Sequence, residues 1–122
     1  MSPGLMLGIA LLGGLGAALR YLLNTWLVEY RRWGGPGAIM LINVIGSFGI
    51  GLTVGLGLEG MWGAWLATGF CGGFTTFGTV SSDAARLARE GRWGQVVWFT
   101  LGQLAVTAVF AVAGALFFTA RP

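Results

Sequence analysis

The chain has 122 residues, of which 9% are charged and 56% are hydrophobic, with 23 glycines, one cysteine and no histidine. Soluble proteins carry about 25% charged residues, and a small soluble domain needs charge on its large surface. The composition therefore excludes a soluble domain. The apolar content excludes intrinsic disorder, and the missing histidine excludes a His/Cys metal site within one chain. An integral membrane protein remains.

Chain length limits the number of membrane crossings. Spans of about 20 residues fit four times into the sequence, together with short loops, and do not fit six times. The predicted fold class is an all-α membrane protein with one transmembrane domain over residues 1–122. Its predicted spans are residues 4–28, 37–58, 61–90 and 95–120.

The third span has an unusual composition. Its apolar part, Met61–Cys71, is too short to cross a bilayer, and Gly72–Thr79 is rich in glycine and threonine, which are poor helix formers. Adding the amphipathic segment Val80–Glu90 gives a segment long enough to span if its helix is broken at residues 72–76. Broken backbone at membrane depth needs hydrogen-bond partners, and transporters and channels bind ions at such breaks. This break is the first pointer to function.

The polar residues inside the spans are neutral. Asn43 and Ser47 are four residues apart on one helix face, as are Gln103 and Thr107, with Thr100 on the same side. Amides and hydroxyls donate hydrogen bonds without charge, so such a track suits a small anion that sheds its water. Hydrogen bonding between helices is the alternative for each residue.

Charge inside the spans is scarce. No acidic or basic residue lies deep in the second or fourth span, and a buried carboxylate is the usual mark of proton-coupled transporters. Arg20, near the end of the first span, either extends to the interface or forms a vestibule that attracts anions. The many glycines indicate closely packed helices and an oligomer.

Three motifs occur in order along the chain. GGLGAALRY at residues 13–21 resembles the GGxxGAxxRY first-helix motif of the Fluc/CrcB fluoride channels, with Gly16 one place nearer to Gly14 than the strict spacing. NVIGSFGIG at residues 43–51 resembles their second-helix motif VNxxGSFxxG. GFCGGFTTFGT at residues 69–79 resembles their signature GFCGGxTTFST. Together the motifs indicate a member of this family.

The resemblance implies four transmembrane helices per subunit, with a broken third helix, in an antiparallel dual-topology homodimer. It implies two fluoride pores, each built from both subunits, and a structural sodium ion (Na+) at the dimer centre, held by backbone carbonyls of Gly72 and Thr75. Phe77 would present its ring edge, the positive part of the aromatic quadrupole, to the ion. The remaining pore residues would be Asn43, Ser47, Gln103 and Thr107, with Arg20 in the vestibule.

The chain departs from the family pattern at two positions and in its charge distribution. Val80 stands where a second phenylalanine usually follows, and Gly78 replaces the common serine. Arginines 20, 31, 32, 86, 89 and 92 fall toward one side of a four-span arrangement and Arg121 alone toward the other. This bias predicts one fixed orientation, with the N-terminus outside, whereas the resemblance implies dual topology.

We therefore expect a passive channel that exports fluoride from the cytoplasm across the cell inner (plasma) membrane, driven by the negative-inside potential. Its expected partners are fluoride, a second copy of the chain and membrane lipid, and not nucleic acid. A small proton-coupled exporter of the multidrug type and a non-conducting assembly subunit are the alternatives. No enzyme is expected, because no lysine follows the Gly72–Gly78 stretch to complete a phosphate-binding loop.

Overall fold

The computed structural model describes the backbone of residues 2–119 and the side chains of residues 2–117. This part of the chain is helical, with connecting turns and no β-strand. Its elements, in order, are α1 (Pro3–Thr25), the π-helical η1 (Trp26–Tyr30), α2 (Gly35–Gly55), α3 (Gly60–Gly63), the π-helical η2 (Ala64–Cys71), α4 (Gly72–Phe74), α5 (Gly78–Arg89) and α6 (Trp93–Thr119).

Local sequence signals set the ends of several helices. The Ser2 hydroxyl accepts a hydrogen bond from the Leu5 N–H at 3.1 Å, which caps α1. The turn between α2 and α3 places Gly57 and Gly60 at φ +68° and +66°, a left-handed conformation that glycine adopts without steric cost. Gly91, at φ +74°, ends α5 in the same way.

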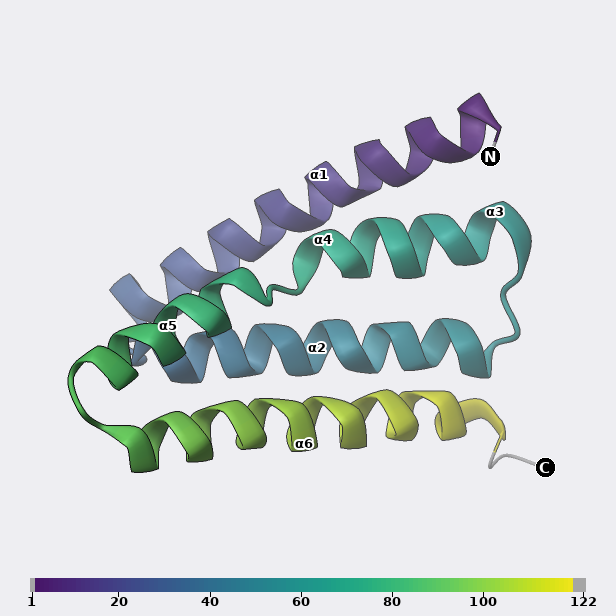
Figure 1. The fold of residues 1–122 in the computed structure, drawn as a ribbon. Helices are drawn as coiled ribbons and strands as arrows, with labels where there is room; N and C mark the ends of the chain where they lie inside the picture. The colour runs from purple at the N-terminus through teal and green to yellow at the C-terminus, as the bar shows by residue number, and fades with distance from the viewer. Residues whose placement is uncertain (1, 120–122) are drawn as a thin grey trace.

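The helices run back and forth between the two ends of the molecule (Figure 1). Three continuous helical segments are long and apolar enough to span a membrane, namely Pro3–Tyr30, Gly35–Gly55 and Trp93–Phe117. They overlap the predicted spans 4–28, 37–58 and 95–120, of which residue 120 lies outside the described residues. The chain between α2 and α6 forms one further pass, α3 to α5 (residues 60–89), which we call the interrupted segment.

The interruption lies at residues 75–77, between α4 and α5. Thr75 leaves the helix with an extended backbone, φ −80° and ψ 160°. The predicted range of 72–76 began too early, because Gly72 and Gly73 are helical. Packing outweighs their low helix propensity, since a Cβ atom on Gly73 would overlap the carbonyl oxygen of Gly13 on α1.

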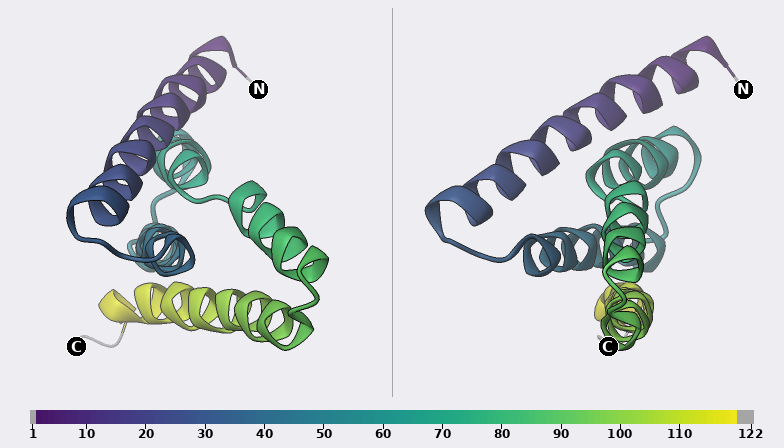
Figure 2. Two further views of the ribbon diagram at one scale, coloured as in Figure 1. Left: turned by 90° about the vertical axis from the view of Figure 1, so that its left-hand side faces the viewer. Right: turned by 60° about the vertical axis from the view of Figure 1, so that its left-hand side comes forward.

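Small residues bring the helices close together at two places. On α1, a Cβ atom at Gly16 would overlap the Phe70 carbonyl and lie 2.9 Å from the Phe74 nitrogen. On α2, a Cβ atom at Gly51 would overlap the Ala111 carbonyl of α6. In Figure 2, α2 is seen nearly end-on in the left view and α6 nearly end-on in the right view, so the two helices cross at an angle. Close backbone approach of this kind drives helix association in membranes.

A small apolar core fixes both halves of the interrupted segment on α2. Phe74 from α4 and Val80 from α5 are buried against Ile39 and Ile42, with Leu23 and Phe99 packed around them. Val80, at the position where the resembling family has a second phenylalanine, is therefore part of this core. The break is thus held from both sides by buried side chains.

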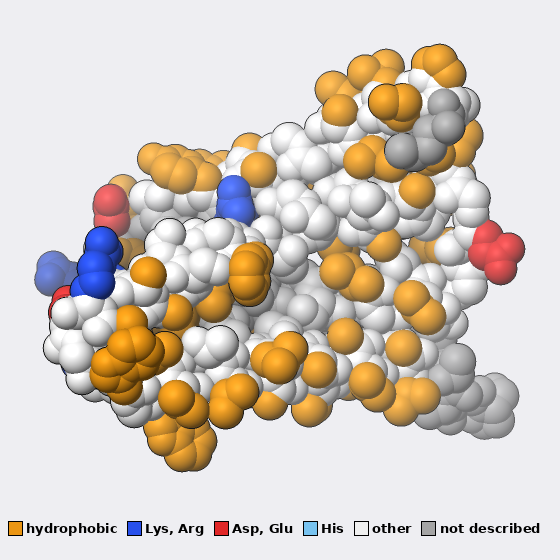
Figure 3. All heavy atoms as spheres, viewed as in Figure 1, with side chains coloured by type: hydrophobic (Ala, Val, Ile, Leu, Met, Phe, Trp, Pro, Cys, Tyr) orange, Lys and Arg blue, Asp and Glu red, His pale blue; other side chains and the backbone are white. Residues whose placement is uncertain are grey.

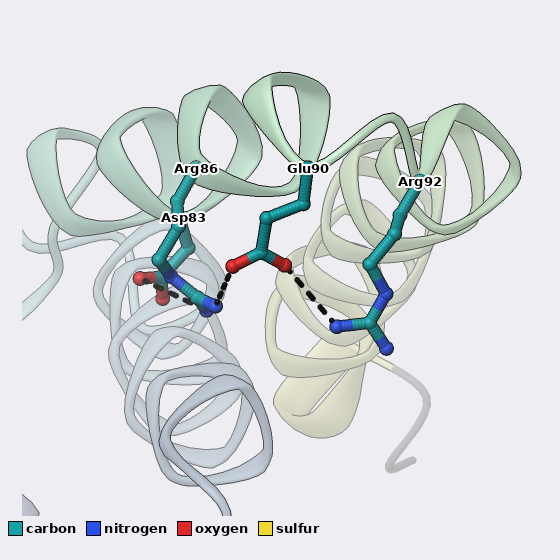
Figure 4. A network of polar contacts seen from close by, with 4 residues as sticks. All are labelled: Asp83, Arg86, Glu90 and Arg92. Carbon is teal, nitrogen blue, oxygen red and sulfur yellow. Dashed lines mark hydrogen bonds and ion pairs between the residues drawn. The ribbon is translucent and has the colours of Figure 1, made fainter.

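Charged side chains gather at the end of the molecule where η1 leads into α2 and α5 leads into α6, while apolar side chains cover much of the face between the ends (Figure 3). Arg86 pairs with Glu90 at 3.6 Å and with Asp83 at 4.0 Å, and Arg92 pairs with Glu90 at 3.3 Å (Figure 4). Exposed pairs of this kind stabilise a fold little. Their position marks this end as a polar face, and Arg121, expected at the opposite end, lies outside the described residues.

We predict that Gly16→Ala destabilises the protein by about 1–3 kcal/mol, because the added methyl group must displace the backbone of the interrupted segment. Gly14→Ala is the matched control, since a Cβ atom there meets nothing within 4 Å and alanine favours the helix. Thermal unfolding in detergent, followed by circular dichroism, measures the difference. Equal unfolding temperatures for the two variants would contradict the packing role of Gly16.

Candidate functional site

The Asn43 side chain of α2 binds the backbone at the break. Its Oδ1 accepts a hydrogen bond from the Thr76 N–H at 2.9 Å, and its Nδ2 donates to the Thr76 carbonyl at 3.1 Å. Asn43 is only 7% exposed, so water does not replace these bonds. One amide therefore satisfies both backbone groups of the residue at the middle of the break.

These contacts leave two carbonyls without their helical donors. In a continuous helix the Thr76 N–H would donate to Gly72 and the Thr79 N–H to Thr75. The Thr76 N–H instead binds Asn43, and the Thr79 N–H donates to the Thr76 hydroxyl at 3.2 Å. The Gly72 and Thr75 carbonyls, the pair expected to bind sodium, have thus lost these helical partners for identifiable reasons.

Arg20, expected in a vestibule, reaches the break from α1. Its Nη1 lies 3.5 Å from the Thr75 carbonyl oxygen, at the long limit of a hydrogen bond. It also lines a cavity of about 350 Å³ with Tyr21, Asn24, Gly35, Ile39, Thr79 and Asp83. The guanidinium group thus lies between this cavity and the break.

A second cavity, of about 360 Å³, lies between α2, the break and α6. We call it the amide cavity. It brings together the five residues predicted for the pore, and Phe77 extends outward at its edge with 82% of its surface exposed. The described residues that line it include none with a charge: Asn43, Ser47, Ile50, Thr75, Thr76, Phe77, Val80, Thr100, Gln103, Leu104 and Thr107.

Gln103 is the buried polar residue on the α6 side of the amide cavity, with 5% of its surface exposed. Its Oε1 accepts a hydrogen bond from Asn43 Nδ2 at 3.3 Å, while its Nε2 has no partner among the described residues. One turn later, the Thr107 hydroxyl donates back to the Gln103 carbonyl at 2.6 Å. The geometry places a neutral, unpaired donor beside the break.

Known proteins are similar to this chain over most of its length. A family model described as CrcB-like protein, Camphor Resistance (CrcB), matches residues 7–115. The chain belongs to the CrcB-like family. The fluoride-specific ion channel FluC 1 of Carboxydothermus hydrogenoformans is 42% identical over 109 residues, 89% of each chain. A fluoride-specific ion channel FluC of Thermus thermophilus is 37% identical over 110 residues, 87% of each chain.

The family assignment and the apolar helices agree on the environment of the protein. Three segments of this CrcB-like chain have the length and composition of membrane spans, and their exposed side chains are largely apolar. The chain is therefore a multi-pass membrane protein.

Two residues of the CrcB-like site were missed from sequence. The Thr76 hydroxyl accepts from the Thr79 N–H in the first turn of α5, and the Thr76 backbone is the group that Asn43 binds. A threonine shortly before an amphipathic helix is a signal for such a bond. Gly46, one turn after Asn43, makes room for Thr75, because a Cβ atom there would overlap the Thr75 methyl group. No local signal separates this glycine from the others of α2.

We predict that Asn43→Ala lowers stability by about 1–3 kcal/mol, since it leaves the buried N–H and carbonyl of Thr76 without partners. Thermal unfolding in detergent measures the loss. Thr53→Ala is the matched control on the same helix, because the buried Thr53 hydroxyl bonds only locally, to Ile50 at 2.6 Å. If the two variants lose the same stability, Asn43 does not hold the break.

Proposed function

We propose that this CrcB-like protein is a fluoride-selective channel of the plasma membrane. Fluoride leaves the cytoplasm through it down the electrochemical gradient, and this export lowers the toxicity of fluoride to the cell. The observation that carries the proposal is the similarity, over 89% of the chain, to a protein named a fluoride-specific ion channel. The amide cavity supports it, because its walls are neutral and include hydrogen-bond donors. A channel of this kind catalyses no reaction.

Passive conduction fits the chemistry of the amide cavity. A proton-coupled exporter of cations depends on an ionisable group in the membrane, and the described lining residues include no carboxylate. Neutral N–H and O–H groups replace part of the water that a small anion loses. The membrane potential, negative inside, then drives the anion outward without a coupling group.

The pore is completed by a second copy in this proposal. Phe77 and Gly72 are exposed on the surface of one chain, although both belong to the segment around the break. An inverted copy packed against this face would cover them and close the amide cavity on its open side. The functional unit is then an antiparallel homodimer, with Phe77 turning its ring edge to the ion and Ser47, Asn43, Gln103 and Thr107 on the opposite walls.

A sodium ion at the centre of this dimer fits the donor set. Oxygen ligands suit a hard cation, and the Gly72 and Thr75 carbonyls have both lost their helical donors. The described residues contain no cluster of His, Cys, Asp or Glu side chains able to hold a metal, so backbone oxygens are the available ligands. When bound, sodium supplies a fixed positive charge that joins the breaks of the two copies.

The proposed selectivity is tested with purified protein in liposomes loaded with fluoride or chloride. Ion-selective electrodes measure the efflux. We expect rapid fluoride efflux once the membrane potential that opposes it is dissipated, and chloride efflux no faster than from protein-free liposomes. Equal fluoride and chloride efflux would refute a fluoride-selective channel.

Tag accessibility on both membrane faces tests the inverted arrangement, and a tag reached from one face only would contradict it.

We predict that Phe77→Ile slows fluoride efflux by at least about tenfold, a barrier increase of about 1.4 kcal/mol, because an aliphatic side chain has no positive ring edge. Phe110→Ile is the matched control, since Phe110 is exposed on α6 and does not line the amide cavity. Size-exclusion chromatography checks that both variants assemble. Unchanged efflux in Phe77→Ile would remove this ring from the pore.

A further inference from the structure

We infer that the Gln103 side-chain amide is the group that donates to the dehydrated anion, and that Asn43 is the positioning residue that aims it. The inference rests on the proposed function and assigns different roles to two amides that the sequence placed together in one pore. The hydrogen bonds of Asn43, Gln103 and Thr107 on the walls of the amide cavity distinguish these roles.

Asn43 has no donor left for an ion. A side-chain amide offers two N–H groups and one carbonyl oxygen. The Asn43 oxygen accepts from the Thr76 N–H, and its Nδ2 donates both to the Thr76 carbonyl and to Gln103 Oε1. Contact with an anion would require Asn43 to release either its bond to the Thr76 carbonyl at the break or its bond to Gln103.

The orientation of Gln103 follows from the backbone. The Thr76 N–H and carbonyl fix which side of the Asn43 amide carries oxygen and which carries nitrogen. Asn43 Nδ2 must then face an acceptor, so Gln103 turns its Oε1 toward it. The Gln103 Nε2 lies on the other side of the same planar amide group. If this amide were flipped, the Gln103 Nε2 would face the Asn43 Nδ2, and two donors would meet without an acceptor.

The Gln103 Nε2 is therefore an unsatisfied donor in a buried position. This nitrogen is buried and has no hydrogen-bond partner among the described residues. Only 5% of the surface of Gln103 is exposed. Leaving such a group unpaired is costly, and buried polar groups are otherwise bonded to protein or water. A small anion entering the amide cavity supplies the missing acceptor.

The neighbouring hydroxyl of Thr107 does not compete for this role. The hydroxyl donates to the backbone of its own helix, since its Oγ1 lies 2.6 Å from the Gln103 carbonyl oxygen and 3.2 Å from the Leu104 carbonyl oxygen. With its one proton used in this way, the hydroxyl has no donor left for an anion. Of the predicted polar track on α6, the amide of Gln103 is the buried member with a free donor.

The test is Gln103→Glu, which keeps the shape and an oxygen that accepts from Asn43 but replaces the free N–H donors by an ionisable oxygen. Fluoride efflux from liposomes is measured from pH 6 to pH 9, with leak through protein-free liposomes subtracted. We expect efflux at least about tenfold below the unmodified protein at pH 9, where an ionised side chain has no donor and repels the anion. Protonation at lower pH restores an O–H donor, so efflux should recover toward pH 6.

Two controls accompany this experiment. Gln95→Glu places the same charge on α6 at the exposed end, outside the amide cavity, and should leave efflux and its pH dependence unchanged. Gln103→Met removes the donor without adding charge, so it should lower efflux at every pH, and it decides the question if the Glu variant does not fold. The assignment is overturned if Gln103→Met, or Gln103→Glu at pH 9, shows the same fluoride efflux as the unmodified protein.

The positioning role of Asn43 is read from a pH profile. The Asn43 donor bond favours the ionised form of the side chain introduced by Gln103→Glu. Adding Asn43→Ala should therefore shift the pH at which efflux is lost to a higher value than in Gln103→Glu alone. An unchanged pH midpoint would mean that Asn43 only supports the fold. Failure of the unmodified protein to conduct fluoride would instead refute the proposed function.

Discussion

The pair of hydrogen bonds between Asn43 and the Thr76 backbone is the interaction on which the rest of the site depends. A helix interrupted inside a membrane exposes N–H and carbonyl groups that lipid cannot satisfy. Asn43 binds one N–H and one carbonyl, and the Thr76 hydroxyl binds the N–H of Thr79. With those donors engaged, the Gly72 and Thr75 carbonyls lose their helical partners without further unwinding of the chain. The break is therefore a specified structure with identifiable caps.

The glycines let this polar clamp reach its target. A side-chain amide spans only a short distance, so α2 must lie close to the break, and Gly46 provides the space for Thr75 beside Asn43. On the opposite side, Gly13 and Gly16 allow α1 to pack on the backbone of η2 and α4, which brings Arg20 to the Thr75 carbonyl. The three sequence motifs are thus three parts of one contact region, and each is needed by the other two.

Hydropathy predicted the three long apolar helices well, because a membrane span requires a minimum length of apolar helix. Helical spacing placed Asn43 with Ser47 on one helix face and Gln103 with Thr107 on another, and the family resemblance placed both pairs in one pore. All four residues line the amide cavity. Helix propensity placed the break too early, because Gly73 packs against Gly13 and stays helical. The separate roles of Asn43 and Gln103 were not predictable, because they depend on the direction of the Thr76 peptide, which no residue pattern encodes.

A series of hydrogen bonds therefore leads from the backbone to the cavity, and each bond fixes the orientation of the next group. The Thr76 peptide orients Asn43, Asn43 orients Gln103, and Gln103 is left with a donor that no described group accepts. Each step uses a neutral group, so in the proposed channel the cavity offers a donor to the anion without a counter-charge that would trap it. A carboxylate in place of either amide would repel an anion, and a guanidinium group would bind it too strongly to release it quickly. In the proposed channel, neutral amides in a fixed orientation would serve both the entry and the exit of the ion.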